Sequence, residues 1–154
     1  MVRIGVISDT HGLLRPEAMA ALAGSDYIVH GGDIGNAAIL AELAAIAPLT
    51  VVRGNNDTGA WARAVPASGR LQVGSVLLYA VHDIATLDID PVREGVQVVI
   101  YGHSHRPLAQ QRGPVLYLNP GSAGPRRFKL PVSVALIDVN DGTMHARIVE
   151  LNLA

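Results

Sequence analysis

The sequence predicts an α/β protein in which two mixed β-sheets pack face to face and helices cover the outside. In the first half of the chain, strand-length apolar runs alternate with helix-length segments, an order typical of parallel strands joined by helical crossovers. In the second half, strand-like runs follow one another with Gly, Pro, Asn and Asp between them, as in antiparallel hairpins. Hydrophobic residues make up 49% of the chain and charged residues 16%, which fits a compact fold with buried strands.

The first half contains three predicted strands and two predicted helices. The helix predicted over 15–24 has Pro16 and Glu17 in its first turn and Gly24 where a C-terminal cap belongs. The helix predicted over 35–47 is rich in alanine and carries apolar residues at helical spacing. Apolar runs rich in β-branched residues predict strands over 2–7, 26–30 and 49–54.

The second half is predicted to be rich in strands. A hairpin over 69–82 turns at Gly74 and Ser75, and further strands are predicted over 96–103, 108–119, 132–139 and 143–151. No linker, repeat or low-complexity segment interrupts the chain, and 154 residues are about the length of one domain. We therefore expect a single domain over residues 1–154.

Composition argues against several classes of function. The net charge is −1, so no broad basic field attracts nucleic acid or an anionic membrane. Without cysteine, the chain has neither disulfides nor thiolate metal sites. The N-terminal apolar run is too short for the core of a signal peptide, and the most apolar longer window, 37–52, is interrupted by Glu42 and Pro48. We expect a cytoplasmic protein with no membrane partner.

Residues that can do chemistry follow five of the predicted strands. They are Asp9-Thr10-His11, His30-Gly31-Gly32-Asp33, Gly54-Asn55-Asn56-Asp57, His82-Asp83 and Gly102-His103-Ser104-His105. In an open parallel sheet, ligands bind beyond the carboxyl ends of the strands. If these five endings share one edge, they gather carboxylates, an amide and imidazoles into one patch.

That set of side chains suits divalent cations. Carboxylate, imidazole and amide ligands without thiolate favour manganese, with iron, zinc or nickel as alternatives. A pair of such ions, about 3.5–4 Å apart, clamps the oxygens of a phosphate and lowers the pKa of bound water toward ~7, so that hydroxide is available near neutral pH. We expect two divalent metal ions.

The five blocks together resemble the calcineurin-like metallophosphoesterases. The chain length, "GHSH" (102–105) and "NPGSAGPRRF" (119–128) are similar to the small bacterial and archaeal phosphodiesterase branch, which also contains the retromer subunit of the same fold. The resemblance implies a four-layer α/β/β/α sandwich and metal-dependent hydrolysis of a small phosphate diester. It implies a first metal held by Asp9, His11 and His105, a second held by Asn55, His82 and His103, and Asp33 bridging both.

Two positions depart from the family pattern. Larger members carry histidine where this chain has Asn56, and an amide can donate a hydrogen bond but cannot deliver a proton. If Asn56 and His82 are catalytic, the enzyme would then favour esters with good leaving groups, or water or another group would protonate the leaving group. Asp83 stands where glycine is common; it either orients His82 or faces solvent, and its usual exposure favours solvent.

Other residues have structural interpretations beside functional ones. His30 and His145 are expected to be structural or solvated, and Asp57 to orient its own turn. Residues 119–122 are expected to form a turn that could position the metal-bearing loops. Trp61 lines a pocket or packs the core, while Arg126, Arg127 and Lys129 form a solvated loop or steer an anionic substrate.

Two functions other than phosphodiester hydrolysis fit the resemblance. One is a metal-binding interaction scaffold with weak or no activity, because a fold does not by itself establish activity. The other is a metal-dependent nuclease, although no extended basic and aromatic track for a nucleic-acid strand is visible. The survival of all seven predicted ligands favours the small-substrate enzyme.

Overall fold

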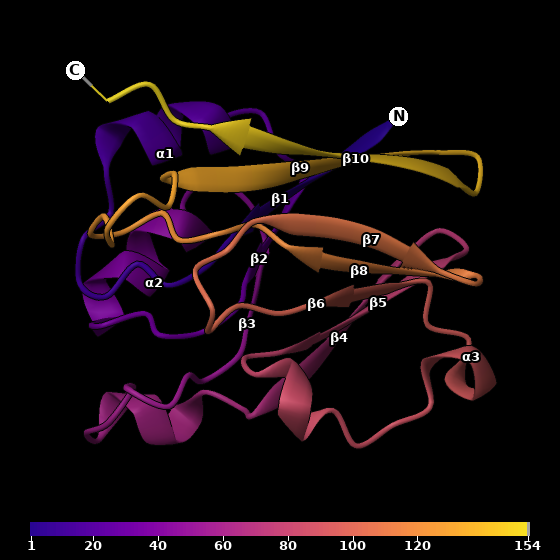
Figure 1. The fold of residues 1–154 in the computed structure, drawn as a ribbon, viewed down its shortest axis with the longest axis horizontal. Coiled ribbons are helices and arrows are strands. Elements are labelled where there is room, and N and C mark those ends of the chain that lie inside the picture. The colour runs from indigo at the N-terminus through magenta and orange to yellow at the C-terminus, as the bar shows by residue number, and fades with distance from the viewer. Residues whose placement is uncertain (154) are drawn as a thin grey trace.

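Ten strands form two five-stranded mixed sheets in the computed structural model, which describes residues 1–153 (Figure 1). The first sheet has the order β10-β9-β1-β2-β3 and the second the order β4-β5-β6-β8-β7. The strands of the first sheet are β1 (Val2–Ile7), β2 (Tyr27–His30), β3 (Leu49–Val51), β9 (Ser133–Asn140) and β10 (Thr143–Glu150). Those of the second are β4 (Ser68–Val73), β5 (Val76–Val81), β6 (Val98–Ile100), β7 (Leu108–Arg112) and β8 (Val115–Asn119).

The strand directions agree with the sequence pattern in the first sheet and only in part in the second, where strands predicted to form hairpins also form parallel pairs. Strands β1, β2 and β3 run parallel, as the alternation of strands and helices predicts, and β9 with β10 adds an antiparallel hairpin to their edge. In the second sheet β5, β6 and β8 are parallel, with β4 and β7 antiparallel at the two edges. Both sheets are therefore mixed.

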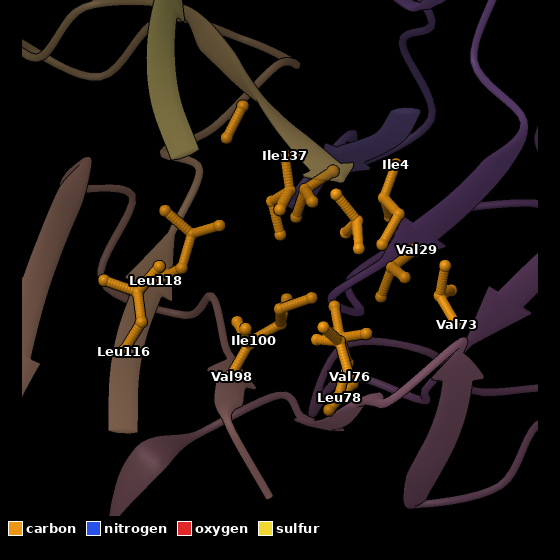
Figure 2. Close-up of a cluster of buried hydrophobic side chains, with 14 of the residues drawn as sticks. Ile4, Val29, Val73, Val76, Leu78, Val98, Ile100, Leu116, Leu118 and Ile137 are labelled. Atoms are coloured by element: carbon orange, nitrogen blue, oxygen red, sulfur yellow. The ribbon is translucent and has the colours of Figure 1, made fainter. Parts of the chain in front are cut away.

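The main hydrophobic core lies between the two sheets (Figure 2). Ile4, Val29 and Ile137 from the first sheet face Leu78 and Ile100 from the second, and all five are buried. The pleat places alternate residues of a strand on opposite faces. This alternation leaves the other face of each sheet free to bury a second apolar layer.

Helices α1 (Pro16–Leu22) and α2 (Ala37–Ala44) pack on the outer face of the first sheet. Leu22 of α1 and Leu43 of α2 are fully buried with Ile7 and Ile28 of the sheet. The start of α2 is capped by Asn36, whose Oδ1 accepts a hydrogen bond of 3.2 Å from the backbone N–H of Ile39. Both predicted helices are confirmed, each shorter than its apolar pattern.

The outer face of the second sheet is covered by a thin layer. Tyr79 and Val99 belong to its buried cluster, which Ile84, Leu87 and Ile89 cover from the segment between β5 and β6. That segment contains the 3₁₀ helix η2 (Ile84–Thr86) and the one-turn helix α3 (Pro91–Glu94); the other 3₁₀ helix is η1 (Trp61–Ala64). The predicted four-layer α/β/β/α sandwich is thus confirmed, with a reduced fourth layer.

One predicted strand is wrong. Residues 108–119 form the hairpin of β7 and β8 instead of a single strand, because Gly113 takes a φ of 56° and reverses the chain. The strands predicted over 49–54 and 96–103 are also shorter, since their polar ends leave the sheets as loops. Within residues 1–153, no helix is both long enough and apolar enough to span a membrane.

Candidate metal centre

The loops that follow β1, β2, β3, β5 and β6 meet in one place, as the sequence predicts. The loop after β1 pairs with the loop after β2, where the N–H of Asp9 donates to Gly32 and the N–H of His11 to Asp33, both at 2.9 Å. The loop after β6 joins them, because the N–H of His103 donates to Asp9 Oδ2 at 3.2 Å. Five distant segments of the chain therefore surround one small volume.

Five of the seven predicted metal ligands have a left-handed backbone. Asp9, His11, Asp33, His103 and His105 have φ values from 45° to 71°. This conformation is uncommon for residues other than glycine and costs roughly 1–3 kcal/mol each. Such strain persists where surrounding structure enforces it and is typical of functional sites. The concentration at these positions indicates that the loops are shaped to aim side chains inward.

A first group of ligand atoms comes from Asp9, His11 and His105. His11 Nε2 lies 3.1 Å from His105 Nε2, and Asp9 Oδ1 lies 3.6 Å and 3.3 Å from these two nitrogens. Atoms bound at roughly 2.0–2.2 Å around one ion lie about 3–3.5 Å from one another. The observed separations are therefore those of a coordination shell.

A second group comes from Asp9, Asp33 and His82, whose ligand atoms all lie within 4.8 Å of one another. His82 Nε2 is 3.3 Å from Asp33 Oδ2, while its Nδ1 donates a hydrogen bond of 2.8 Å to the carbonyl of Gly31. That bond places the ring proton on Nδ1, so the lone pair of Nε2 faces the carboxylates. Asp33 Oδ2 also lies 3.7 Å from His11 Nε2 and thus faces both groups.

Asn55 and His103 lie together at the exposed rim of the second group. His103 Nδ1 is 3.2 Å from Asn55 Oδ1, and the rings of His103 and His82 meet edge-on with centroids 5.3 Å apart. The structure thus brings together all seven residues predicted to bind metal. Asp9, Asp33, His82 and His105 are buried, His11 is half-buried, and Asn55 and His103 are exposed.

The centre fits cations because it leaves buried polar atoms unsatisfied. Asp9 Oδ1, His82 Nε2 and His105 Nδ1 are buried and have no hydrogen-bond partner among residues 1–153. Buried polar atoms without a partner are rare, because each costs free energy. Two of these atoms, Asp9 Oδ1 and His82 Nε2, belong to the groups described above, where a divalent cation would satisfy them.

The two carboxylates are ionised at neutral pH. Burial raises the pKa of Asp9, but the imidazoles of His105 and His11 and the hydrogen bond from Ser8 outweigh it and hold the pKa below its usual value. Burial also raises the pKa of Asp33, but His82 and the two hydrogen bonds from Asn56 lower it by more, so the net pKa is below its usual value. A charge of −2 therefore faces the histidines at neutral pH.

Known proteins share this arrangement of residues along most of the chain. The profile of the calcineurin-like phosphoesterase superfamily domain matches residues 2–142. The chain belongs to this superfamily. A probable metallophosphoesterase of Methanothermobacter thermautotrophicus is 32% identical over an alignment of 158 positions, gaps included, that covers 95% of this chain and 91% of the relative. The phosphodiesterase YfcE of Escherichia coli K12 is 26% identical, with 90% and 88% covered.

Solved structures show the same architecture. The crystal structure of Vps29 from Chaetomium thermophilum has a TM-score of 0.78 to this calcineurin-like domain, over 98% of this chain and 97% of that one, at 20% identity. Identity this low shows the shared fold alone. The resemblance inferred from the five sequence blocks is confirmed by these comparisons.

Asp57 ties together two of the loops that carry candidate metal ligands in this phosphoesterase domain. Its buried carboxylate accepts hydrogen bonds from the backbone N–H groups of Ile34, Gly35 and Gly54 at 2.9–3.1 Å. It therefore orients its own turn, as predicted, and also fixes the loop that carries Asp33. Gly54 is required at this contact, because a Cβ there would overlap the backbone and carboxylate of Asp33.

Replacing Asp57 with asparagine is expected to lower the free energy of unfolding by roughly 3 kcal/mol, since the amide NH₂ would face N–H donors and leave some of them buried without an acceptor. Urea unfolding of the metal-free protein measures this. The matched control is Asp90→Asn, whose exposed side chain accepts one hydrogen bond from Arg93 N and whose replacement should cost less than about 1 kcal/mol. Equal losses in the two variants would contradict the role of Asp57.

The turn at 119–124 is hydrogen-bonded to the loops that carry the candidate metal ligands. Asn119 Nδ2 donates to the carbonyl of Gly102 at 3.1 Å, and Ser122 Oγ donates to the carbonyl of Asp9 at 2.9 Å. The N–H of Ala123 donates to the carbonyl of Ser8 at 3.0 Å. The predicted structural turn is confirmed, and its contacts reach both the β1 and β6 loops.

His30 is a buried structural residue. Thr10 Oγ1 donates to the carbonyl of Ile34 at 2.7 Å, so it accepts from His30 Nε2 at 3.1 Å, and His30 Nδ1 accepts from the N–H of Gly32 at 3.0 Å. The neutral ring satisfies both nitrogens and links the β1 loop to the β2 loop. Burial lowers the pKa of His30 to about 4.

The structure also decides between several alternatives left by the sequence. Asp83 does not orient His82; it caps η2, where its Oδ1 accepts from Ala85 N at 3.0 Å. Trp61 packs against the core between the first sheet and its helices. His145 is exposed, as expected. The sequence pattern did not predict a role for the side chains of Ser8, Thr10 and Ser122, which donate hydrogen bonds to loops that are distant in sequence.

Proposed function

We propose that this protein is a phosphodiesterase that hydrolyses a small phosphate diester with two divalent metal ions, manganese being the first choice. One observation carries the proposal. Two groups of candidate ligand atoms, both containing Asp9, lie side by side, and they include buried atoms that have no hydrogen-bond partner within residues 1–153. Membership of a superfamily with relatives named phosphodiesterase supports it.

Asp9, His11 and His105 would hold one ion, and His82, Asn55 and His103 the other, with Asp33 between them. When bound, the ions supply a nucleophile from water near neutral pH and neutralise the charge that builds on the phosphate oxygens. Histidine binds metal only when neutral. Burial lowers the pKa of His82, but Asp33 and the Gly31 carbonyl raise it by more, so its pKa lies above the ordinary value of histidine. A metal ion must therefore compete with a proton at His82. Metal binding and activity should therefore weaken as the pH falls.

Asn56 lies beside the bridging carboxylate without being a proton donor. Its backbone N–H and its Nδ2 donate to the two oxygens of Asp33 at 2.9 Å and 3.0 Å. The side chain thus orients Asp33 and has no acidic proton for a leaving alcohol. This supports a preference for esters whose leaving group departs without protonation.

The proposal is tested by an assay with bis(p-nitrophenyl) phosphate and p-nitrophenyl phosphate in parallel, with and without added manganese, backed by elemental analysis. We expect two metal equivalents per chain, hydrolysis that requires metal, and a higher kcat/KM for the diester. Metal binding without hydrolysis of either ester would instead indicate an interaction scaffold. Activity after complete removal of metal would contradict the proposal.

Replacing Asn56 with histidine is expected to raise the ratio of monoester to diester kcat/KM by about tenfold or more, because an imidazole can protonate a poor leaving group. The same two esters measure it. The control is Asn140→His at the end of β9, which lies outside the ligand groups and should leave the ratio unchanged. No change in Asn56→His would mean that the leaving group obtains its proton elsewhere.

A further inference from the structure

A pocket of about 350 Å³ opens beside the second group of predicted ligands. Its lining includes Asn55 and His82, so the pocket adjoins the candidate metal centre, and it also includes Arg53, Asp83 and Thr86, which are outside the predicted ligand set. A phosphate held at the metals would therefore place one of its ester groups in this pocket. Pockets of this size accommodate small organic groups.

The pocket wall carries two opposite charges that do not neutralise each other. Arg53 is exposed, its backbone N–H is held by the carbonyl of Pro66 at 2.8 Å, and its guanidinium has no carboxylate within 4.0 Å among residues 1–153. Asp83 uses Oδ1 to cap η2, which fixes its carboxylate at the pocket and leaves Oδ2 free of any hydrogen bond within the described chain. Arg53 and Asp83 thus both line the pocket, and the guanidinium of Arg53 lies more than 4.0 Å from the carboxylate of Asp83.

We infer that this pocket selects diesters in which one alcohol carries both an ammonium and a carboxylate group, as in a phosphodiester of a hydroxy-amino acid. Arg53 would bind the carboxylate through its planar fork of N–H donors, and Asp83 would bind the ammonium. Because the guanidinium of Arg53 and the carboxylate of Asp83 do not pair with each other, both are available to a ligand that carries one negative and one positive group. The inference rests on the proposed function and adds the substrate class.

The test uses three phosphodiesters that share a p-nitrophenyl leaving group and differ in the second alcohol: propanol, ethanolamine and serine. In each, water attacks phosphorus, the bond to the p-nitrophenyl oxygen breaks, and p-nitrophenolate leaves. We expect kcat/KM to rise about tenfold from propyl to aminoethyl and again about tenfold from aminoethyl to seryl, since each charge gains one charge-assisted contact worth roughly 1.4 kcal/mol.

Two variants separate the two contacts. Arg53→Gln should remove the advantage of seryl over aminoethyl, and Asp83→Asn the advantage of aminoethyl over propyl; asparagine keeps the oxygen that caps η2. The matched controls are Arg63→Gln on η1 and Asp88→Asn, exposed residues that do not line the pocket and should leave both ratios unchanged.

Binding gives a readout that is independent of turnover. Isothermal titration of the manganese-loaded protein should show that O-phosphoserine binds about a hundredfold more tightly than propyl phosphate. Arg53→Gln should reduce this difference to about tenfold, since the contact between Asp83 and the ammonium remains. Hydrolysis of all three diesters at equal kcat/KM, or equal affinity for the two monoesters, would overturn the inference and leave the phosphodiesterase proposal intact. Failure to hydrolyse any of the three with manganese present would contradict the proposed function itself.

Discussion

Asp33→Asn is expected to lower kcat/KM for an activated diester by about a thousandfold or more and to reduce metal content below one equivalent per chain. Asp33 Oδ2 faces His82 Nε2 at 3.3 Å and His11 Nε2 at 3.7 Å, so one carboxylate serves both groups of ligands. The substitution removes a charge from between the two groups of candidate ligands while keeping the shape of the side chain. A thousandfold loss corresponds to about 4 kcal/mol of transition-state stabilisation.

Elemental analysis and kinetics on the same preparation measure this effect. The matched control is Asp26→Asn: Asp26 is exposed and accepts a hydrogen bond from Arg3 N, away from the ligand groups. The control should retain full activity and two equivalents of metal. If Asp33→Asn kept both metals and more than a tenth of the activity, Asp33 would not bridge the ions.

The second large effect concerns pH and the stability of the metal-free protein. The pKa of His30 is about 4 in the folded protein, because of burial, against about 6.5 in an unfolded chain. Between these values the unfolded chain binds a proton that the folded protein does not, so folding weakens as the pH falls from 6.5 to 4. The 2.5-unit difference corresponds to about 3 kcal/mol over this range.

Urea unfolding in the presence of a chelator, at several pH values from 8 to 4, measures this dependence. His30→Gln has no titrating ring, so its free energy of unfolding should fall by about 3 kcal/mol less than that of the wild type over the same range. The exposed His145 provides the control, since His145→Gln should follow the wild-type curve. Parallel curves for wild type and His30→Gln would show that the buried ring does not resist protonation.

The sequence predicted the part of the fold that depends on local pattern. The alternation of strands and helices through β3 follows from periodicity, and the convergence of Asp9 and Asp33 follows from the rule that parallel strands of one sheet end at the same edge. His82 follows β5 of the second sheet, so it meets them only because the two sheets pack face to face. The hairpin of β7 and β8 was missed because β7 is an exposed edge strand, and its polar residues Gln110, Gln111 and Arg112 show no apolar alternation that would mark its end before Gly113. Helix α3 was missed because four residues are too few to show a helical period.

The support around the site could not be predicted, because it depends on contacts between segments that are far apart in the chain. Asp57 bonds to Ile34, 23 residues away, and Ser122 bonds to Asp9, 113 residues away. A serine or aspartate in a turn gives no sign of its distant partner. The pocket lined by Arg53 and Asp83 could not be predicted from the sequence for the same reason, since the segments after β3 and β5 form it together.

The central claim is that these loops hold two metal ions side by side, and anomalous X-ray scattering from crystals grown with manganese tests it most directly. We predict two peaks about 3.5–4 Å apart, one bounded by Asp9, His11 and His105 and the other by Asn55, His82 and His103, with Asp33 touching both. A single peak, or no peak among these side chains at saturating manganese, would contradict the account.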